Sequence, residues 1–208
     1  MNRRIAALDG GTYYHLNALN DSAWAHLIDE RIYLPELAER ELDSFDVLIA
    51  TCRSNSDLIA LARKQIDSFL EKGGTVVAFA GTGPERWLPE VTPISVPTNY
   101  WWWLDRDADS GLRIAAPDHS FFQAMTLSDC TWHHHCRFRP PPGAVSLIDH
   151  TDGNSLFYED RVSSRGTLLI TGLDPFFHHG SHFMPATTRF LASFLPWLRY
   201  DAPPKRRS

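Results

Sequence analysis

The chain has 208 residues, enough for one sizeable core, and its 43% hydrophobic and 22% charged residues are ordinary for a soluble globular domain. A net charge of -5 argues against a general nucleic-acid-binding protein, which would carry a basic face. Three cysteines are too few for a disulfide scaffold and are typical of a reducing compartment. No apolar run has the length of a signal peptide core or a membrane span. We therefore expect a cytoplasmic protein that binds neither nucleic acid nor a membrane.

The first half of the chain predicts a strand–helix–strand unit. Residues 4–8 form a first short strand, and residues 46–51 are an apolar, β-branched run that predicts a second. A helix with a broad apolar stripe follows over 55–72, and a buried strand over 75–80 comes after Gly73-Gly74. This arrangement predicts parallel pairing with a right-handed crossover. Two shorter helical pieces are expected at 22–28 and 35–42.

The second half of the chain begins with an irregular excursion at about 84–118, which contains the aromatic run Tyr100-Trp101-Trp102-Trp103. Five further elements are expected: a strand over 131–138, a hairpin over 145–148 and 155–159, a buried strand over 167–171, and a closing helix over 185–198. Residues 201–208 are expected to be a disordered tail. Together the elements predict a single α/β domain over 1–200, a flavodoxin-like three-layer sandwich with a mostly parallel central sheet.

Polar side chains gather after the ends of the predicted strands, where open α/β sheets bind ligands. The strand over 167–171 is followed by Asp174, His178, His179 and His182. Imidazoles and carboxylates of this kind move protons or hold metals at neutral pH. The candidate catalytic residues are Asp9, His15, Thr82, Asp174, His178 and His179. The alternative is a polar loop whose imidazoles bond backbone or water.

The other walls of the expected site are two glycine turns and nearby side chains. The candidate ligand-binding residues are Gly10, Gly11, Cys52, Gly81, Trp102 and His134. On a regular strand over 131–138, His134 shares a face with Trp132, and buried packing is the alternative to ligand binding. His178, His179 and His182 are also the candidate ligands of a divalent metal, if the loop that carries them is helical. The cofactor is otherwise unknown, and a homo-oligomer remains open.

Two predicted strands joined by a long helix resemble the class I glutamine amidotransferase-like fold. The first is Asp46-Val47-Leu48-Ile49-Ala50, and the second is Gly73-Gly74-Thr75-Val76-Val77-Ala78-Phe79-Ala80-Gly81. The ending Gly166-Thr167-Leu168-Leu169-Ile170-Thr171-Gly172-Leu173-Asp174 is similar to that of the trehalose-utilisation (ThuA-like) branch. The turn that carries the nucleophilic cysteine in glutaminases reads Gly81-Thr82-Gly83 here, and Leu173 stands where that branch has histidine. The resemblance therefore implies the fold and a carbohydrate-related role, without glutamine hydrolysis.

Two functions follow as hypotheses. The first is a small-molecule metabolic enzyme, a hydrolase or isomerase on a sugar-like substrate, that uses the histidines and aspartates at the rim of the sheet. The second is a non-catalytic ligand-binding or assembly domain of the same fold. The absent cysteine favours the second function, and the clustered histidines favour the first.

Overall fold

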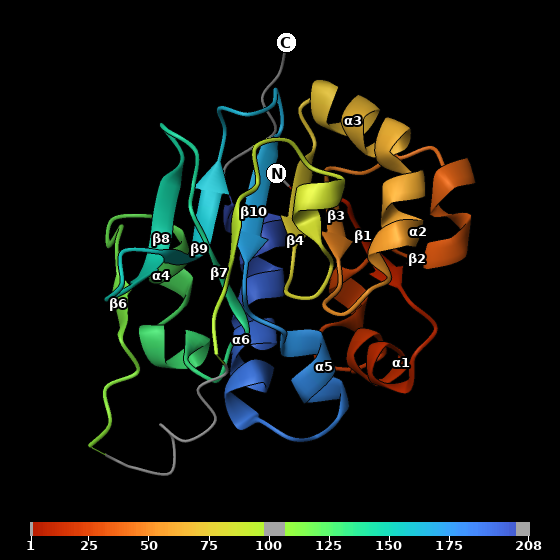
Figure 1. Cartoon of the computed structure of the whole chain (residues 1–208). Coiled ribbons are helices and arrows are strands. Elements are labelled where there is room, and N and C mark those ends of the chain that lie inside the picture. Colours follow the sequence, from red (N-terminus) through yellow and green to blue (C-terminus); the bar gives the residue numbers. More distant parts are fainter. Residues whose placement is uncertain (1, 98–106, 203–208) are drawn as a thin grey trace.

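The computed structural model describes residues 2–97 and 107–202, and it contains a ten-stranded mixed sheet with helices on both faces (Figure 1). Five parallel strands form one half of the sheet, in the order β2 (Glu30–Tyr33), β1 (Ile5–Asp9), β3 (Val47–Ala50), β4 (Thr75–Ala78), β10 (Thr167–Thr171). The other half pairs antiparallel: β9 (Ser155–Asp160), β7 (Cys136–Phe138), β8 (Val145–His150), β5 (Pro93–Ser95) and β6 (Leu112–Ile114).

The expectation of a mostly parallel sheet is therefore right for only one half. The hairpin of β8 and β9 was predicted, and its short turn at Asp152-Gly153 forces antiparallel pairing. Strand β9 then pairs antiparallel with β10, the last parallel strand. The chain is an α/β protein whose sheet changes from parallel to antiparallel at β10.

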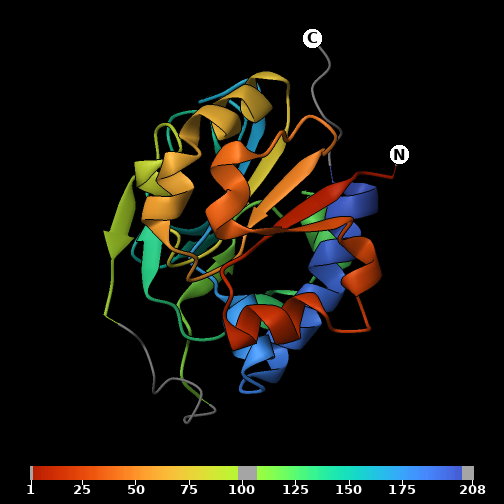
Figure 2. The same ribbon diagram turned by 90° about the vertical axis from the view of Figure 1, so that its right-hand side faces the viewer.

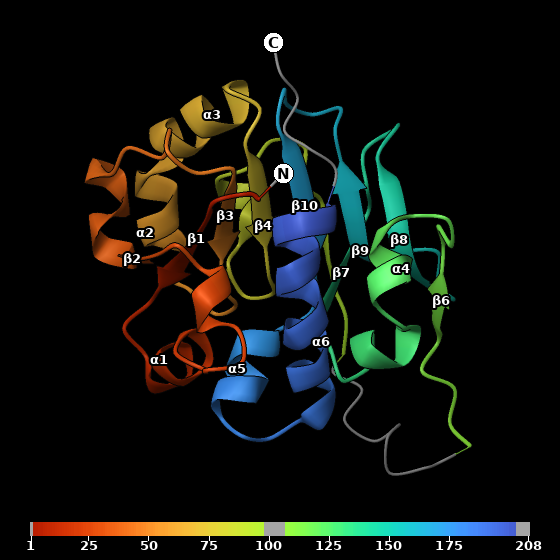
Figure 3. The same ribbon diagram turned by 180° about the vertical axis from the view of Figure 1, so that it is seen from behind.

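Helices cover the parallel strands from both sides, as the edge-on view shows (Figure 2). On one side lie α2 (Ser56–Leu61) and α3 (Arg63–Glu71). On the other side lie α1 (Tyr13–Leu19), α4 (Phe121–Ala124), α5 (Pro175–Gly180) and α6 (Pro185–Pro196), seen from behind in Figure 3. Successive strand residues alternate between the two layers: Val77 belongs to the core under α6, and Val76 to the core under α3. Each layer thus has its own apolar core.

Several predicted elements differ from the structure. The helix expected over 55–72 is two helices that meet at Ala62, and the pieces expected at 22–28 and 35–42 are 3₁₀ turns, Ala25–Leu27 and Leu34–Glu39. Strand β2 was not predicted, and the excursion contributes the short strands β5 and β6. The strand expected over 131–138 is only Cys136–Phe138, because Thr126 and Asp129 cap a 3₁₀ turn over Leu127–Cys130 just before it.

The remaining predictions agree with the structure or lie outside its described part. Strands β1, β3, β4 and β10 and the helix α6 fall where they were expected, and α6 ends in a π-helical turn over Trp197–Asp201. The aromatic run at 100–103, with Trp102, lies outside the described residues, as does the predicted tail from 203 on; the first two tail residues are ordered, because Asp201 ends the π-helical turn and Ala202 is buried. None of the helices in the described part of the chain has the length and apolar character that a bilayer crossing needs.

Candidate functional site

The candidate site lies beyond the carboxyl end of β10, where the chain turns into α5. The loop expected after β10 is in fact mostly this short helix, with Asp174 at its N-cap position and Pro175 in its first turn. Helical spacing brings Asp174 and His178 to the same face. At Gly172 a Cβ atom would lie 2.2 Å from the carbonyl oxygen of Cys136. Only glycine therefore allows the segment before β7 to approach, and this segment brings Trp132 and His133 to the site.

Asp174 is the buried centre of this site and is 1% exposed. Its Oδ1 accepts a hydrogen bond from Trp132 Nε1 at 3.0 Å, and its Oδ2 accepts one from Arg53 Nη2 at 3.1 Å. His178 Nε2 lies 3.2 Å from Oδ1, in ion-pair contact but off the direction of a hydrogen bond. Burial works to raise the pKa of Asp174, but the contacts with His178, Trp132 and Arg53 together bring that pKa below its usual value. The carboxylate is therefore charged at neutral pH.

His178 is buried as deeply, at 2% exposed, and its ring is held between aromatic neighbours. The ring stacks on Phe183 with centroids 5.6 Å apart, and it meets the His133 ring edge-on at 4.5 Å. Because a carboxylate oxygen is the polar atom nearest to Nε2, we place the proton of the neutral ring on Nε2. Nδ1 then carries a lone pair, and it has no hydrogen-bond partner within the described part of the chain.

His133 and Arg53 complete the polar side of the site. Burial is the largest cause that lowers the pKa of His133 to about 4, so this ring is neutral at pH 7. The Arg53 guanidinium lies over the Phe177 ring, with Cζ 3.5 Å from the ring centroid, as in a cation–π contact. Arg53 remains 38% exposed at its side chain, which makes it the solvent-facing cation of the site.

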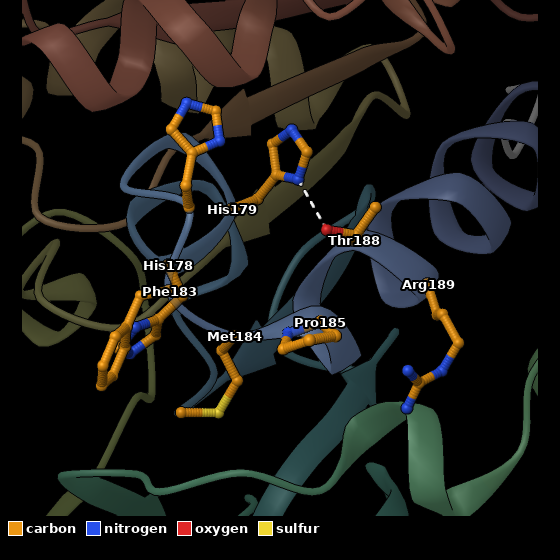
Figure 4. Close-up of a pocket in the computed structure, with 8 residues that line it drawn as sticks. His178, His179, Phe183, Met184, Pro185, Thr188 and Arg189 are labelled. Carbon is orange, nitrogen blue, oxygen red and sulfur yellow. Dashed lines mark hydrogen bonds between the residues drawn. The ribbon is translucent and has the colours of Figure 1, made fainter.

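A pocket of about 410 Å³ opens beside His178 (Figure 4). Its lining residues come from the end of α5, the following loop and the start of α6: His178, His179, His182, Phe183, Met184, Pro185, Thr188 and Arg189. In Figure 4, Phe183 and His178 form one side and Arg189 lies on the far side, beyond Met184 and Pro185. Phe183 is 62% exposed and stacks on His178, so it covers this imidazole on one face.

A second group of predicted site residues meets at the ends of β1 and β3. His15 Nδ1 accepts a hydrogen bond from the backbone N–H of Gly10 at 3.0 Å, so its Nε2–H donates to the Cys52 carbonyl oxygen at 2.9 Å. Burial lowers the pKa of His15, in agreement with this neutral tautomer. Asp9 Oδ1 accepts from the N–H of Gly11. The structure places these residues together, and their contacts with one another close the turn.

The two remaining histidines of the predicted metal site have other surroundings. His179 Nε2 contacts Asp21 Oδ2 at 3.0 Å, and its Nδ1 contacts the Thr188 hydroxyl at 2.8 Å. Both nitrogens are thus occupied, and neither offers a lone pair to a metal. His182 is exposed and lies beyond the helix with a φ of 56°. Over residues 2–97 and 107–202, no three His, Cys, Asp or Glu side chains converge as metal ligands, so these residues do not fit the expected metal.

Thr82, Gly81 and His134 are not brought into contact with His178. The Thr82 hydroxyl is buried and donates to the Phe79 carbonyl oxygen at 2.7 Å. Gly81 has a φ of 76°, and a Cβ there would lie 3.3 Å from the Arg53 backbone, so it allows the close passage of the Arg53 chain. His134 accepts a hydrogen bond from Arg137 Nε at 3.0 Å, on the side of the β8–β9 turn.

The site residues that the sequence analysis left out are Arg53, Trp132 and His133. Arg53 directly follows Cys52 at a predicted strand end, so its position was a usable signal. A regular strand over 131–138 would place the neighbours Trp132 and His133 on opposite faces. The 3₁₀ turn before them replaces that alternation and buries both side chains.

No family model and no curated protein matches the chain. Solved structures do match in fold. A GMP synthase component from Thermoplasma acidophilum superposes with a TM-score of 0.54 at 11% identity, over 94% of this chain and 93% of that one. The N-terminal domain of IFT52 gives a TM-score of 0.53 at 11% identity, over 96% and 99%. The exo-β-1,4-mannosidase Op5Man5 from Opitutaceae bacterium strain TAV5 gives 0.52 at 16% identity, over 99% of this chain.

These matches show the fold alone. The fold is glutamine amidotransferase-like, as the resemblance in the sequence implies. The chain spans 37% of the length of the mannosidase that it matches, so in that enzyme the shared fold is one part of a longer chain. Proteins with this fold therefore include chains of different size and activity.

Proposed function

We propose that this protein is a small-molecule enzyme in which His178, oriented by Asp174, transfers a proton at the rim of the sheet. The observation that carries the proposal is the buried imidazole of His178, whose Nδ1 has no partner among the described residues. Leaving a buried polar group unpaired costs about 1–3 kcal/mol. Buried polar groups of this kind, beside a charged partner and next to a pocket, concentrate at functional sites.

The chemistry of the proposal is general acid–base catalysis. Nδ1 of His178 accepts a proton from a substrate C–H or O–H group or from an attacking water molecule. The ring is then a cation, and the Asp174 carboxylate 3.2 Å away stabilises it. The same Nδ1–H returns the proton to the product or to the leaving oxygen. Trp132 and Arg53 hold the carboxylate in place during both steps.

The substrate class that we propose is a sugar-like polar molecule. The resemblance to the trehalose-utilisation branch supports it, as does the fold shared with part of a mannosidase. We do not expect glutamine hydrolysis, because the only hydroxyl in the Gly81-Thr82-Gly83 turn donates to the Phe79 carbonyl. The reaction is then a hydrolysis or an isomerisation that needs one mobile proton.

The second candidate is a non-catalytic ligand-binding or assembly domain. It is favoured because no serine, threonine or cysteine is hydrogen-bonded to the His178 ring among the described residues, and because the N-terminal domain of IFT52 has the same fold. In this alternative the pocket beside His178 binds a ligand without converting it.

The test is turnover measured by proton NMR in D₂O, which detects both hydrolysis and exchange of a carbon-bound proton for deuterium. The full chain is incubated with a panel of aldoses, ketoses and aryl glycosides, each in neutral, acidic and phosphorylated forms. We expect one class to react, with a His178→Gln variant slower by about 10²–10⁴-fold. The exposed His26, changed to Gln, is the matched control and should leave the rate unchanged. Binding without turnover in the unaltered protein would favour the second candidate, and equal rates in His178→Gln would remove His178 from the mechanism.

A further inference from the structure

Arg53 is held in an unusual backbone position at the edge of the candidate site. It follows the end of β3 and has a φ of 62°, in the left-handed region that residues other than glycine rarely adopt. Its N–H donates to the Ala80 carbonyl oxygen at 2.9 Å, which ties the end of β3 to the end of β4. The fold thus keeps this side chain at the rim although a glycine would fit the backbone with less strain.

The contacts of the Arg53 guanidinium fix its plane but use few of its donors. The group stacks on Phe177 at 3.5 Å, and Nη2 donates to Asp174 Oδ2 at 3.1 Å. Nε and Nη1 have no hydrogen-bond partner among the described residues. A guanidinium carries five N–H donors in a rigid fork that suits carboxylates and phosphates. An oriented fork with unused donors, 38% exposed, can bind such an anion.

The charges around Arg53 also favour an anion. Asp174 is the carboxylate of the site, and it is already shared among Trp132, Arg53 and His178. The imidazoles of His133 and His178 and the thiols of Cys52 and Cys136 also lie near the Asp174 carboxylate. When His178 becomes a cation by taking a proton, the site holds two positive groups against one buried negative group. An anionic substrate group would balance this charge.

We infer that Arg53 anchors an oxyanion of the substrate, a carboxylate or a phosphate, and so places the rest of the molecule against His178. This inference rests on the proposed function, since it names the substrate class for the same site. The substrate would then be an acidic or phosphorylated polar molecule. Neutral analogues of the same size would lack the contact to the free Nε–H and Nη1–H donors.

The experiment is an anion titration of the full chain followed by NMR of the Arg53 Nε–H and the His178 imidazole. The probes are inorganic phosphate and acetate, added at constant ionic strength with chloride. We expect saturable shifts of both signals for at least one probe, and the probe that saturates identifies a phosphate or a carboxylate. Glucose 6-phosphate against glucose, and gluconate against sorbitol, then compare each anion with a neutral partner, and only the anionic member should bind.

The variants separate Arg53 from general charge effects. Arg53→Met should weaken the affinity for the anion by about 10-fold or more, since a hydrogen bond to a charged group contributes about 1.5–3 kcal/mol. Arg53→Lys keeps the positive charge but lacks the planar fork of donors, so its affinity for the anion should lie between those of Arg53→Met and the unaltered protein. Arg63→Met is the matched control, because Arg63 is an exposed arginine on α3 paired with Asp67.

Two results would overturn the inference: shifts that never saturate, or equal affinity in Arg53→Met and the unaltered protein. The proposed function is judged separately with His178→Gln. If this variant binds the anion within about threefold of the unaltered protein while Arg53→Met loses affinity, Arg53 is the anchor whatever the outcome of the turnover assay. If turnover depends on His178 but no anion binds, the proposed function stands and this inference fails.

Discussion

His178 Nε2 lies 3.2 Å from Asp174 Oδ1, and both residues are buried on one short helix that follows the last parallel strand. The i,i+4 spacing along α5 fixes this contact, while Trp132 holds Oδ1 of the carboxylate and Arg53 holds Oδ2. The pair has the arrangement in which a carboxylate orients an imidazole for proton transfer. His179 also contacts a carboxylate, that of Asp21, but its Nδ1 is hydrogen-bonded to Thr188, whereas Nδ1 of His178 has no partner among the described residues.

Replacing His178 and replacing His179 should have opposite effects. His178→Gln should slow ligand turnover by about 10²–10⁴-fold and should cost less free energy of unfolding than His179→Gln, because neither ring nitrogen of His178 makes a hydrogen bond among the described residues. His179→Gln should cost about 1–3 kcal/mol, because it breaks contacts with both Asp21 and Thr188. Urea unfolding and the turnover assay measure the two effects. A large loss of stability in His178→Gln, with none in His179→Gln, would show that His178 has a structural role and would contradict this prediction.

Asp174→Asn should destabilise the protein by about 1–3 kcal/mol at pH 7, because Trp132 and Arg53 donate hydrogen bonds to this buried carboxylate and the His178 ring contacts it. The pKa of Asp174 is lowered in the folded state, so its contribution is present above the unfolded pKa and is lost as pH falls through the folded one. The difference between the variant and the unaltered protein should therefore shrink below about pH 4. Asp67→Asn, which removes an exposed partner of Arg63, is the control and should change little. A constant difference down to pH 2 would contradict this account.

Stability should fall as pH drops from about 6.5 toward 4, in a window set by histidines. Burial lowers the pKa of both His133 and His134 to about 4 in the folded protein. The unfolded chain then binds more protons in this window, so the folded state loses stability as pH falls, by on the order of 1–3 kcal/mol for each ring. Above pH 7 both rings are neutral in the folded and the unfolded chain, so they do not make the free energy of unfolding depend on pH. Free energies of unfolding at pH 7.5 and 5 test this, and His134→Gln should show a smaller difference between the two. Equal free energies at both pH values are the contrary result.

Removing the Phe183 ring should uncover His178. Phe183 is 62% exposed and stacks on the imidazole, so it shields one face of a ring that is itself 2% exposed. In Phe183→Ala we expect His178 to react several-fold faster with diethyl pyrocarbonate, as measured by peptide mass spectrometry. The exposed His26 should react at the same rate in both proteins and serves as the internal control. An unchanged rate at His178 would mean that another part of the chain shields it.

The periodic, apolar parts of the fold could be predicted from the sequence, and the site only in part. Strand β10 and its position before Asp174 and His178 follow from the run Thr167–Thr171. The helix α5 was not expected, because Gly180 weakens a helix; yet Gly180 ends this helix where a Cβ would lie 2.0 Å from the Tyr14 carbonyl oxygen.

Tertiary contacts decide which of the candidate residues keep a donor or acceptor without a hydrogen-bond partner. No local sequence pattern encodes these contacts. His15 and His179 have the same side chain as His178, but their partners Gly10, Cys52, Asp21 and Thr188 come from other elements. Arg53 reaches Asp174 across 121 positions of sequence. Such pairings follow from the packing of the sheet and helices and become visible only in three dimensions.

The most direct test of the central claim is the ¹⁵N NMR spectrum of the His178 ring at a pH where the ring is neutral, assigned by comparison with His178→Gln. We predict the tautomer with the proton on Nε2, facing the Asp174 carboxylate, and a bare Nδ1 that is ready to accept a proton. In Asp174→Asn the preference for this tautomer should weaken. A His178 ring that carries its proton on Nδ1, with no change in Asp174→Asn, would contradict the account, because Asp174 would then not orient the base.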